Sequence, residues 1–62
     1  MEKCYVVIGY FEETYLVFGT FSTIDKANDF IEERANLLKI GAHYEPVIDK
    51  WRVYVEETIF YG

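Results

Sequence analysis

The chain has 62 residues, of which 52% are hydrophobic and 19% aromatic, and its formal net charge is −5. We expect one domain spanning residues 1–62, because a chain of this length has no room for a second core. The negative charge repels phosphate, which argues against sequence-independent nucleic-acid binding and against anionic membrane surfaces. Cys4 is the only cysteine, so an internal disulfide and a thiolate metal cluster are excluded.

The first nine residues, Met-Glu-Lys-Cys-Tyr-Val-Val-Ile-Gly, lack the long apolar stretch and small-residue cleavage site of a secretory signal. No apolar run approaches the roughly 18 residues that a membrane span needs. Together with the unpaired cysteine, these features predict a cytoplasmic protein. A core this small is only marginally stable without a disulfide or a metal, so we expect association to stabilise it.

Two apolar strands open the chain. Residues 3–11 and 15–21 are rich in β-branched and aromatic side chains, as strands are. The short polar break Glu12-Glu13-Thr14 predicts a hairpin, although it lacks the glycine of a tight primed turn. Both strands are apolar on both faces, whereas a sheet face that meets water is normally polar.

A capped helix is expected next. Ser22 offers a hydroxyl as N-cap, and Asp25, three residues later, is placed as in a capping box. Lys39 suits the last turn, and Gly41 suits the position after the helix, where the backbone becomes left-handed. The helix is therefore predicted over residues 25–39. Apolar residues at steps of three and four would form its buried stripe, namely Ile24, Ala27, Ile31, Ala35 and Leu38.

Two further strands follow. Residues 42–48 form a weaker strand, because Pro46 lacks a backbone donor and favours an edge or an irregular entry. Residues 51–56 alternate clearly, and the tail from Glu57 either extends that strand or folds back. The fold class predicted is α+β, in the order ββαββ, with an antiparallel sheet and one helix packed on one face.

A single helix covers only one face of such a sheet, so the other face should carry an interface. A one-residue register error would exchange the two sets, so the sequence does not fix which set faces the helix. Our assignment places four residues under the helix: Val6, Ile8, Val17 and Val53. The outer set, predicted as a homo-oligomer interface, is Tyr5, Val7, Leu16, Phe18 and Tyr54.

No catalytic constellation is evident. Cys4 has apolar alternate neighbours and is expected to act as a small hydrophobe, and Ser22 is explained as a helix cap. His43 and Glu45 should point to one side of their strand, but a closed metal site needs three or four ligands. We therefore predict that the protein is not an enzyme and has no cofactor, catalytic residue or metal site.

Four acidic residues lie away from the apolar stripe of the helix: Asp25, Asp29, Glu32 and Glu33. Like charges one helical turn apart cost a few tenths of a kcal/mol per pair. Two interpretations remain open. The residues form a solvated surface that aids solubility, or they bind a host protein that carries a basic patch.

The stretch Leu16-Val-Phe-Gly-Thr-Phe-Ser-Thr-Ile-Asp-Lys-Ala-Asn-Asp-Phe-Ile resembles the opening of a SPOR domain, and Trp51-Arg-Val-Tyr-Val resembles a later strand of that family. This resemblance implies that peptidoglycan glycan strands bind across the sheet. In length and acidity the chain is also similar to small phage-encoded proteins, which implies inhibition or redirection of a host or defence protein. Our preferred prediction is a non-catalytic, homo-oligomeric protein-binding regulator. A SPOR-like glycan-binding module and a purely structural oligomer remain as alternatives.

Overall fold

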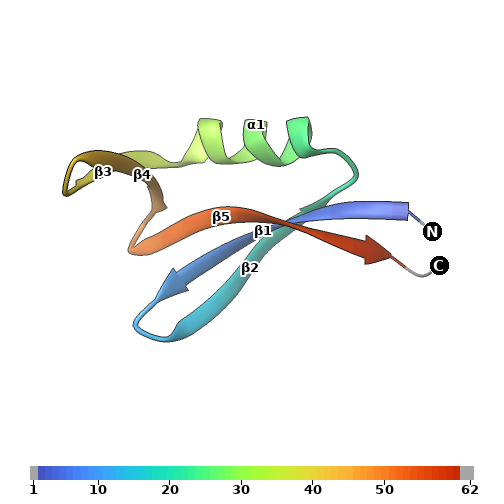
Figure 1. The fold of residues 1–62 in the computed structure, drawn as a ribbon, viewed down its shortest axis with the longest axis horizontal. Helices are drawn as coiled ribbons and strands as arrows, with labels where there is room; N and C mark the ends of the chain where they lie inside the picture. The colour runs from blue at the N-terminus through green and yellow to red at the C-terminus, as the bar shows by residue number, and fades with distance from the viewer. Residues whose placement is uncertain (1, 61–62) are drawn as a thin grey trace.

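The computed structural model describes residues 2–60, apart from the side chain of Phe60. Five strands and one helix follow each other along the chain (Figure 1). They are β1 (Glu2–Phe11), β2 (Thr14–Phe21), α1 (Ile24–Arg34), β3 (Asn36–Ile40), β4 (His43–Ile48) and β5 (Trp51–Phe60). None of the described helices is long and apolar enough to cross a membrane.

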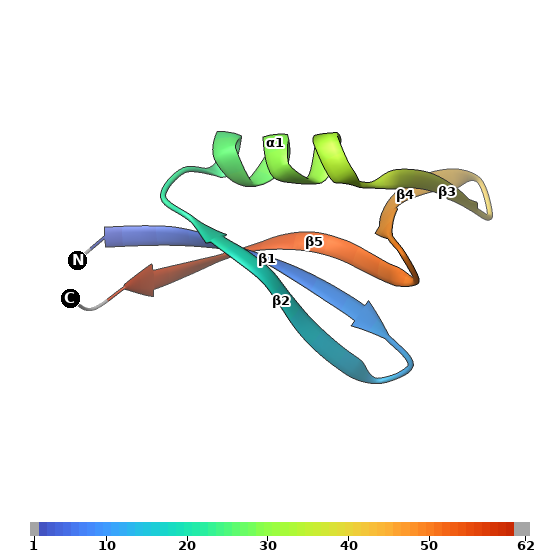
Figure 2. The same cartoon turned by 180° about the vertical axis from the view of Figure 1, so that it is seen from behind.

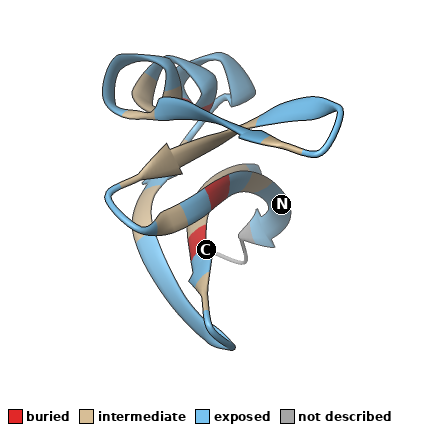
Figure 3. Ribbon diagram, turned by 90° about the vertical axis from the view of Figure 1, so that its left-hand side faces the viewer, coloured by how far each residue is buried: buried red, intermediate tan, exposed pale blue. Residues whose placement is uncertain are grey.

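The strands form one antiparallel sheet in the order β2-β1-β5-β4-β3. The predicted α+β class with the order ββαββ is therefore wrong. Strands take up 66% of the described chain, and five of them curl into a half-barrel. Figure 3 shows this curl, and Figure 2 shows from behind that the β3–β4 hairpin projects beyond the end of α1.

The start of α1 differs from the prediction by one residue. Thr23, not Ser22, is the N-cap, and its hydroxyl accepts a hydrogen bond from the backbone N–H of Lys26 at 3.2 Å. The hydroxyl of Ser22 instead lies 3.4 Å from the side-chain nitrogen of Lys26. Thr23 has the extended backbone typical of a cap, so it satisfies one of the N–H groups left free in the first turn.

The end of the helix differs more. The predicted helix over residues 25–39 is too long, because Ala35 already has an extended backbone and caps the last turn with its N–H on the carbonyl of Ile31. Residues 36–40 pair with β4 instead, and Gly41, with φ of 61°, serves the β3–β4 turn. Leu38 has the spacing of the helical stripe, but pairing with β4 places it in β3, where it is half exposed.

The core is small and lies inside the curl. Val7 of β1, Ala27 of α1 and Val53 of β5 are its buried residues, at 0%, 0% and 5% exposure. Rings of Phe21 and Phe30 pack beside it with centroids 5.3 Å apart. Of the predicted helical stripe, Ala27 is buried, Ile31 and Ala35 are half-buried, and Ile24 and Leu38 are exposed.

The β1–β2 turn is tighter than predicted. Glu12 and Glu13 alone separate the two strands, and their φ angles are 46° and 65°. Two consecutive residues with positive φ are the signature of a primed hairpin turn, which usually contains asparagine or glycine. The hairpin therefore forms without the residues that normally favour it, because two long strands pair on either side.

Of the two predictions for the tail from Glu57, extension of the last strand is confirmed and folding back is wrong as far as Phe60. β5 continues to Phe60 and pairs with β1 along nearly its whole length, from Tyr10 opposite Arg52 to Glu2 opposite Phe60. By contrast, β4 pairs with β5 only at Val47 and Ile48. That pairing begins directly after Pro46, because a proline has no backbone N–H to donate to a neighbouring strand. Residues 61–62 of the predicted tail lie outside the described residues.

Candidate functional site

The strands β2, β1 and β5 have two faces of contrasting environment. The face inside the curl, here the inner face, packs against α1 through Val7 and Val53. Residues that pair across antiparallel strands point to the same side, so the register defines the opposite side, here the outer face. Its apolar and aromatic members are Val6, Ile8, Tyr10, Tyr15, Val17 and Tyr54.

The predicted assignment of residues to the two faces is exchanged on β1 and β2. Val7 is buried in the core, and Tyr5 and Phe18 pack against it. Leu16 pairs with Gly9 and therefore also belongs to the inner side, although it is exposed. Only Tyr54 of the predicted interface set lies on the outer face. Of the set predicted under the helix, only Val53 is there; Val6, Ile8 and Val17 lie on the outer face.

A β-bulge in β2 explains part of this exchange. The register shifts between Val7 and Ile8 of β1, so Val7 pairs with Gly19 and Ile8 pairs with Val17. Phe18 is the extra residue, and its ring lies directly over Gly9, where an added Cβ would come within 2.5 Å of the ring atom Cε2. The bulge thus brings both Phe18 and Phe21 to the inner face.

The outer face is open to solvent. Val17 is 61% exposed, Tyr15 is 65% exposed and Tyr54 is 43% exposed. Within residues 2–60, α1 is the only helix, and it packs on the other side. Contiguous apolar surface rimmed by polar residues is typical of an interaction site.

Three tyrosines form the densest part of this face. The rings of Tyr10 and Tyr15 are 5.2 Å apart between centroids and tilted by 49°. Together with Tyr54, Arg52 and Glu45 they line a shallow hollow of about 300 Å³. Partial removal from water, then the neighbouring Tyr15 and Glu56, raise the pKa of Tyr54 above its usual value of 10.0.

Two opposite charges flank Tyr54 on the outer face. Arg52 and Glu56 are the residues two before and two after it on β5, so all three point to one side. Both charged residues are exposed, and neither forms an ion pair with another described side chain. At the rim of the hollow, Glu45 instead contacts His43, with 3.3 Å between Nε2 and Oε2.

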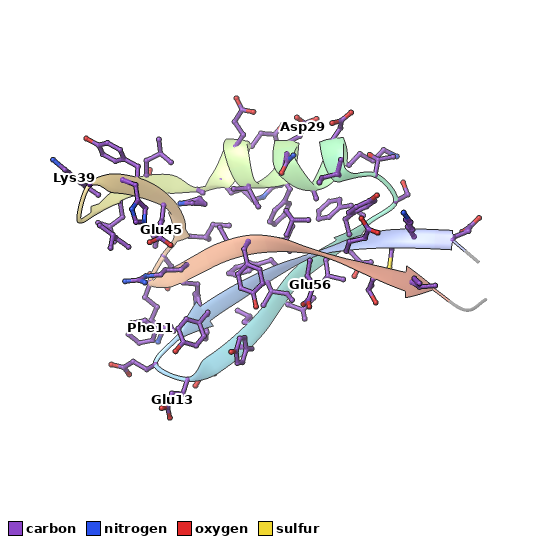
Figure 4. All side chains as sticks on the ribbon, in the orientation of Figure 1. Phe11, Glu13, Asp29, Lys39, Glu45 and Glu56 are labelled. Carbon is purple, nitrogen blue, oxygen red and sulfur yellow. The ribbon has the colours of Figure 1, made fainter. Side chains whose placement is uncertain are left out.

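A second hollow, of about 350 Å³, lies between the end of β1 and the segments β3, β4 and the start of β5, and is lined by Tyr10, Phe11, Glu12, Leu38, Val47, Lys50 and Arg52. Lys50 stands over the rings of Phe11 and Trp51 there, at 5.2 and 5.6 Å from their centroids. The cation is thus held by aromatic faces of its own chain. Figure 4 shows Phe11 at this end of the molecule, with Glu13 at the tip of the β1–β2 turn.

The acidic residues of α1, Asp25, Asp29, Glu32 and Glu33, are all exposed. Glu33 contacts Arg34 at 3.3 Å. Figure 4 shows Asp29 on α1 at one side of the molecule and Glu56 on β5, apart from the helix. Contact with a basic host protein stays a prediction.

The other predicted candidates border the outer face. Cys4 is half-buried on β1, opposite Thr58 of β5. His43 and Glu45 do point to one side, as strand alternation predicted. Among the side chains that the structure describes, no three histidine, cysteine or acidic residues come together as a metal site would require.

Comparisons of the chain with protein-family models, with curated proteins and with solved structures gave no match. The resemblances to SPOR domains and to phage proteins therefore stay predictions. The structure itself carries the functional argument.

Proposed function

We propose that this chain is a non-catalytic protein-interaction module that associates with itself through the outer face. The observation that carries the proposal is the unequal covering of two apolar faces on the same three strands. On the inner face, α1 packs against Val7 and Val53. On the outer face, four of the six apolar and aromatic residues are exposed, the other two, Val6 and Ile8, are half-buried, and no helix of the described chain packs there.

Composition supports the proposal. Half of these six residues are tyrosines, which are enriched at interfaces because a rigid ring buries much area and its hydroxyl can still form a hydrogen bond. Isolated domains of this size rarely gain enough stability from one core, and among the side chains that the structure describes only Val7, Ala27 and Val53 are buried hydrophobic residues. Burying the outer face would enlarge the apolar surface that is removed from water.

Sedimentation equilibrium from micromolar to millimolar protein tests this proposal. We expect wild-type protein to associate, and Val17→Glu to remain monomeric because it puts an unpaired charge into the apolar contact. Leu37→Glu is the matched control, because Leu37 is 72% exposed on the edge strand β3 and the variant has the same net charge. A wild-type protein that stays monomeric throughout, or a loss of association in Leu37→Glu alone, would contradict the proposal.

A further inference from the structure

The outer face is arranged in three rows that run across the strands. The register places Val17, Ile8 and Tyr54 in a central row. On one side lies a bulky row of Tyr15, Tyr10 and Arg52, and on the other a smaller row of Thr20, Val6 and Glu56. Each row contains one residue from β2, one from β1 and one from β5, in that order.

This arrangement is complementary to itself. A two-fold axis along the central row would lay a second copy on the first with each strand antiparallel to its counterpart. The bulky row of one copy would then face the smaller row of the other. Tyr15 would meet Thr20, Tyr10 would meet Val6, and Arg52 would meet Glu56, each pair occurring twice by symmetry.

Size and charge both match in this arrangement. Large rings would lie opposite small side chains, as close packing between two sheets requires. Val6 and Glu56 of the second copy would reach the hollow of about 300 Å³ that Tyr10, Tyr15, Arg52, Tyr54 and Glu45 line, where Glu45 already contacts His43. Arg52 and Glu56, which have no ion-pair partner among the described side chains, would each gain one of opposite charge.

The exposed rings and Val17 supply about half of the area per partner of a standard interface. With exposures of 37%, 65%, 43% and 61%, Tyr10, Tyr15, Tyr54 and Val17 leave on the order of 400 Å² of side-chain surface open. The flanking polar residues extend the contact toward the roughly 800 Å² per partner of a standard interface. A rotation about the other in-plane axis, along β1, would instead exchange β2 with β5 and place Arg52 opposite Tyr15 and Glu56 opposite Thr20, so that neither charge would meet an opposite charge.

We propose that the occupant of the outer face is a second copy of this chain, related by a two-fold axis along the Val17–Ile8–Tyr54 row, with Arg52 of each copy paired with Glu56 of the other. This inference rests on the proposed function and specifies its geometry. Because the charged pairs flank the apolar row, they fix the orientation of the two copies more than the strength of their contact.

A charge exchange tests this geometry. Arg52→Glu and Glu56→Arg, measured singly by sedimentation equilibrium, should each weaken dimerisation by about tenfold, because each replaces two attractive contacts by two repulsive ones. The double variant Arg52→Glu/Glu56→Arg should return the dissociation constant to within about threefold of wild type, since the pairs are restored with reversed signs.

Two controls separate local pairing from net charge. Lys26→Glu on α1 changes the net charge from −5 to −7, as Arg52→Glu does. Glu57→Arg changes it from −5 to −3, as Glu56→Arg does, but on the inner side of the sheet, where Glu57 contacts Lys3. Both controls should dimerise within about threefold of wild type. Circular dichroism and thermal unfolding establish that all variants are folded.

The outcomes distinguish the two proposals. If Val17→Glu abolishes association but the double variant is no tighter than the weaker single variant, the two-fold geometry is overturned while the proposed function stands. If association survives Val17→Glu and is lost in Leu37→Glu, copies join through the β3 edge and both proposals fail. If the wild-type protein is monomeric at all concentrations, both proposals are overturned, and the outer face is available to a different partner.

Discussion

The two faces of β2, β1 and β5 are alike in composition and differ in what covers them. Val7 on the inner face is wholly buried under Ala27 of α1, whereas Val17 on the outer face is 61% exposed. Tyr5 packs against the core on one side, and Tyr15 stands in solvent on the other. Apolar composition therefore does not by itself define the core. The face on which the short helix packs becomes the core.

This difference also separates stability from function. Residues of the inner face should control whether the chain folds, because burial there removes apolar surface from water within one copy. Residues of the outer face should control association and leave the folded monomer nearly unchanged. Each prediction below tests one side of that distinction.

The largest expected difference is between Val7→Asp and Val17→Asp. A carboxylate in place of Val7 would be buried without a partner at a cost of several kcal/mol, which approaches the roughly 3–5 kcal/mol available to a domain of this size. We expect Val7→Asp to be unfolded by circular dichroism. Val17→Asp should lose less than about 1 kcal/mol in urea unfolding at low micromolar concentration, where the monomer is measured. Equal losses in both variants would show that the two faces are not distinct.

A smaller effect is expected at Gly9, which lies between β2 and β5. An alanine Cβ there would come within 2.5 Å of the Phe18 ring and 3.0 Å of the Trp51 Cβ, so the inner face would have to shift. Overpacking of this kind costs about 1–3 kcal/mol. Gly19→Ala is the milder comparison, because its closest contacts are ring atoms of Phe21 at 3.1 Å. If Gly9→Ala unfolds in urea at the wild-type midpoint, Phe18 does not close the inner face.

The cap of α1 tests the element that covers the inner face. Thr23→Ala removes the hydroxyl that accepts the N–H of Lys26 and should lower the free energy of unfolding by about 1 kcal/mol. Ser22→Ala should change it by less than about 0.5 kcal/mol, because its hydroxyl contacts only an exposed side chain. If Ser22→Ala lowers the free energy of unfolding more than Thr23→Ala does, in thermal or urea unfolding, then Ser22 is the cap.

The smallest effect concerns Tyr54 on the outer face. Its pKa is raised in the folded protein, so the unfolded chain loses this proton first as the pH rises. The contribution of Tyr54 to stability is therefore complete below about pH 10 and is lost as the pH rises through the pKa of the folded state. Tyr54→Phe should lessen the alkaline loss of stability relative to wild type, measured by urea unfolding between neutral pH and pH 11. Tyr44→Phe on β4 controls for removal of a tyrosine, and an equal change in both variants would contradict the assignment.

The sequence was informative where local chemistry decides the structure. A β-branched and aromatic composition predicted the first two strands, and alternation predicted the strand from Trp51. The stretch after Phe21 predicted a helix start to within one residue. The lack of alternation in polarity on β1 and β2 also predicted a second apolar face. These features depend on neighbouring residues alone.

Long-range pairing explains what the sequence could not predict. Leu38 fits the helical stripe, yet residues 36–40 gain a partner strand in β4 and leave the helix. The choice of face on β1 depends on the bulge at Phe18 and on pairing with β5, and both alternating sets are apolar. A one-residue offset therefore exchanged the two faces, and with them most of the predicted interface. The ring of Phe18 lies over Gly9 on the inner face, and the sequence alone did not predict this contact.

The most direct test of self-association through the outer face is an isotope-filtered NOE measurement on an equimolar mixture of ¹³C-labelled and unlabelled protein. Tyr10 and Val6 are four residues apart on β1, about 13 Å along a strand, so no NOE between them arises within one copy. We expect intermolecular NOEs between the Tyr10 ring protons and the Val6 methyl groups. An associated sample in which intermolecular NOEs come only from Leu37 and its neighbours on β3, and none from Tyr10, would contradict the proposal.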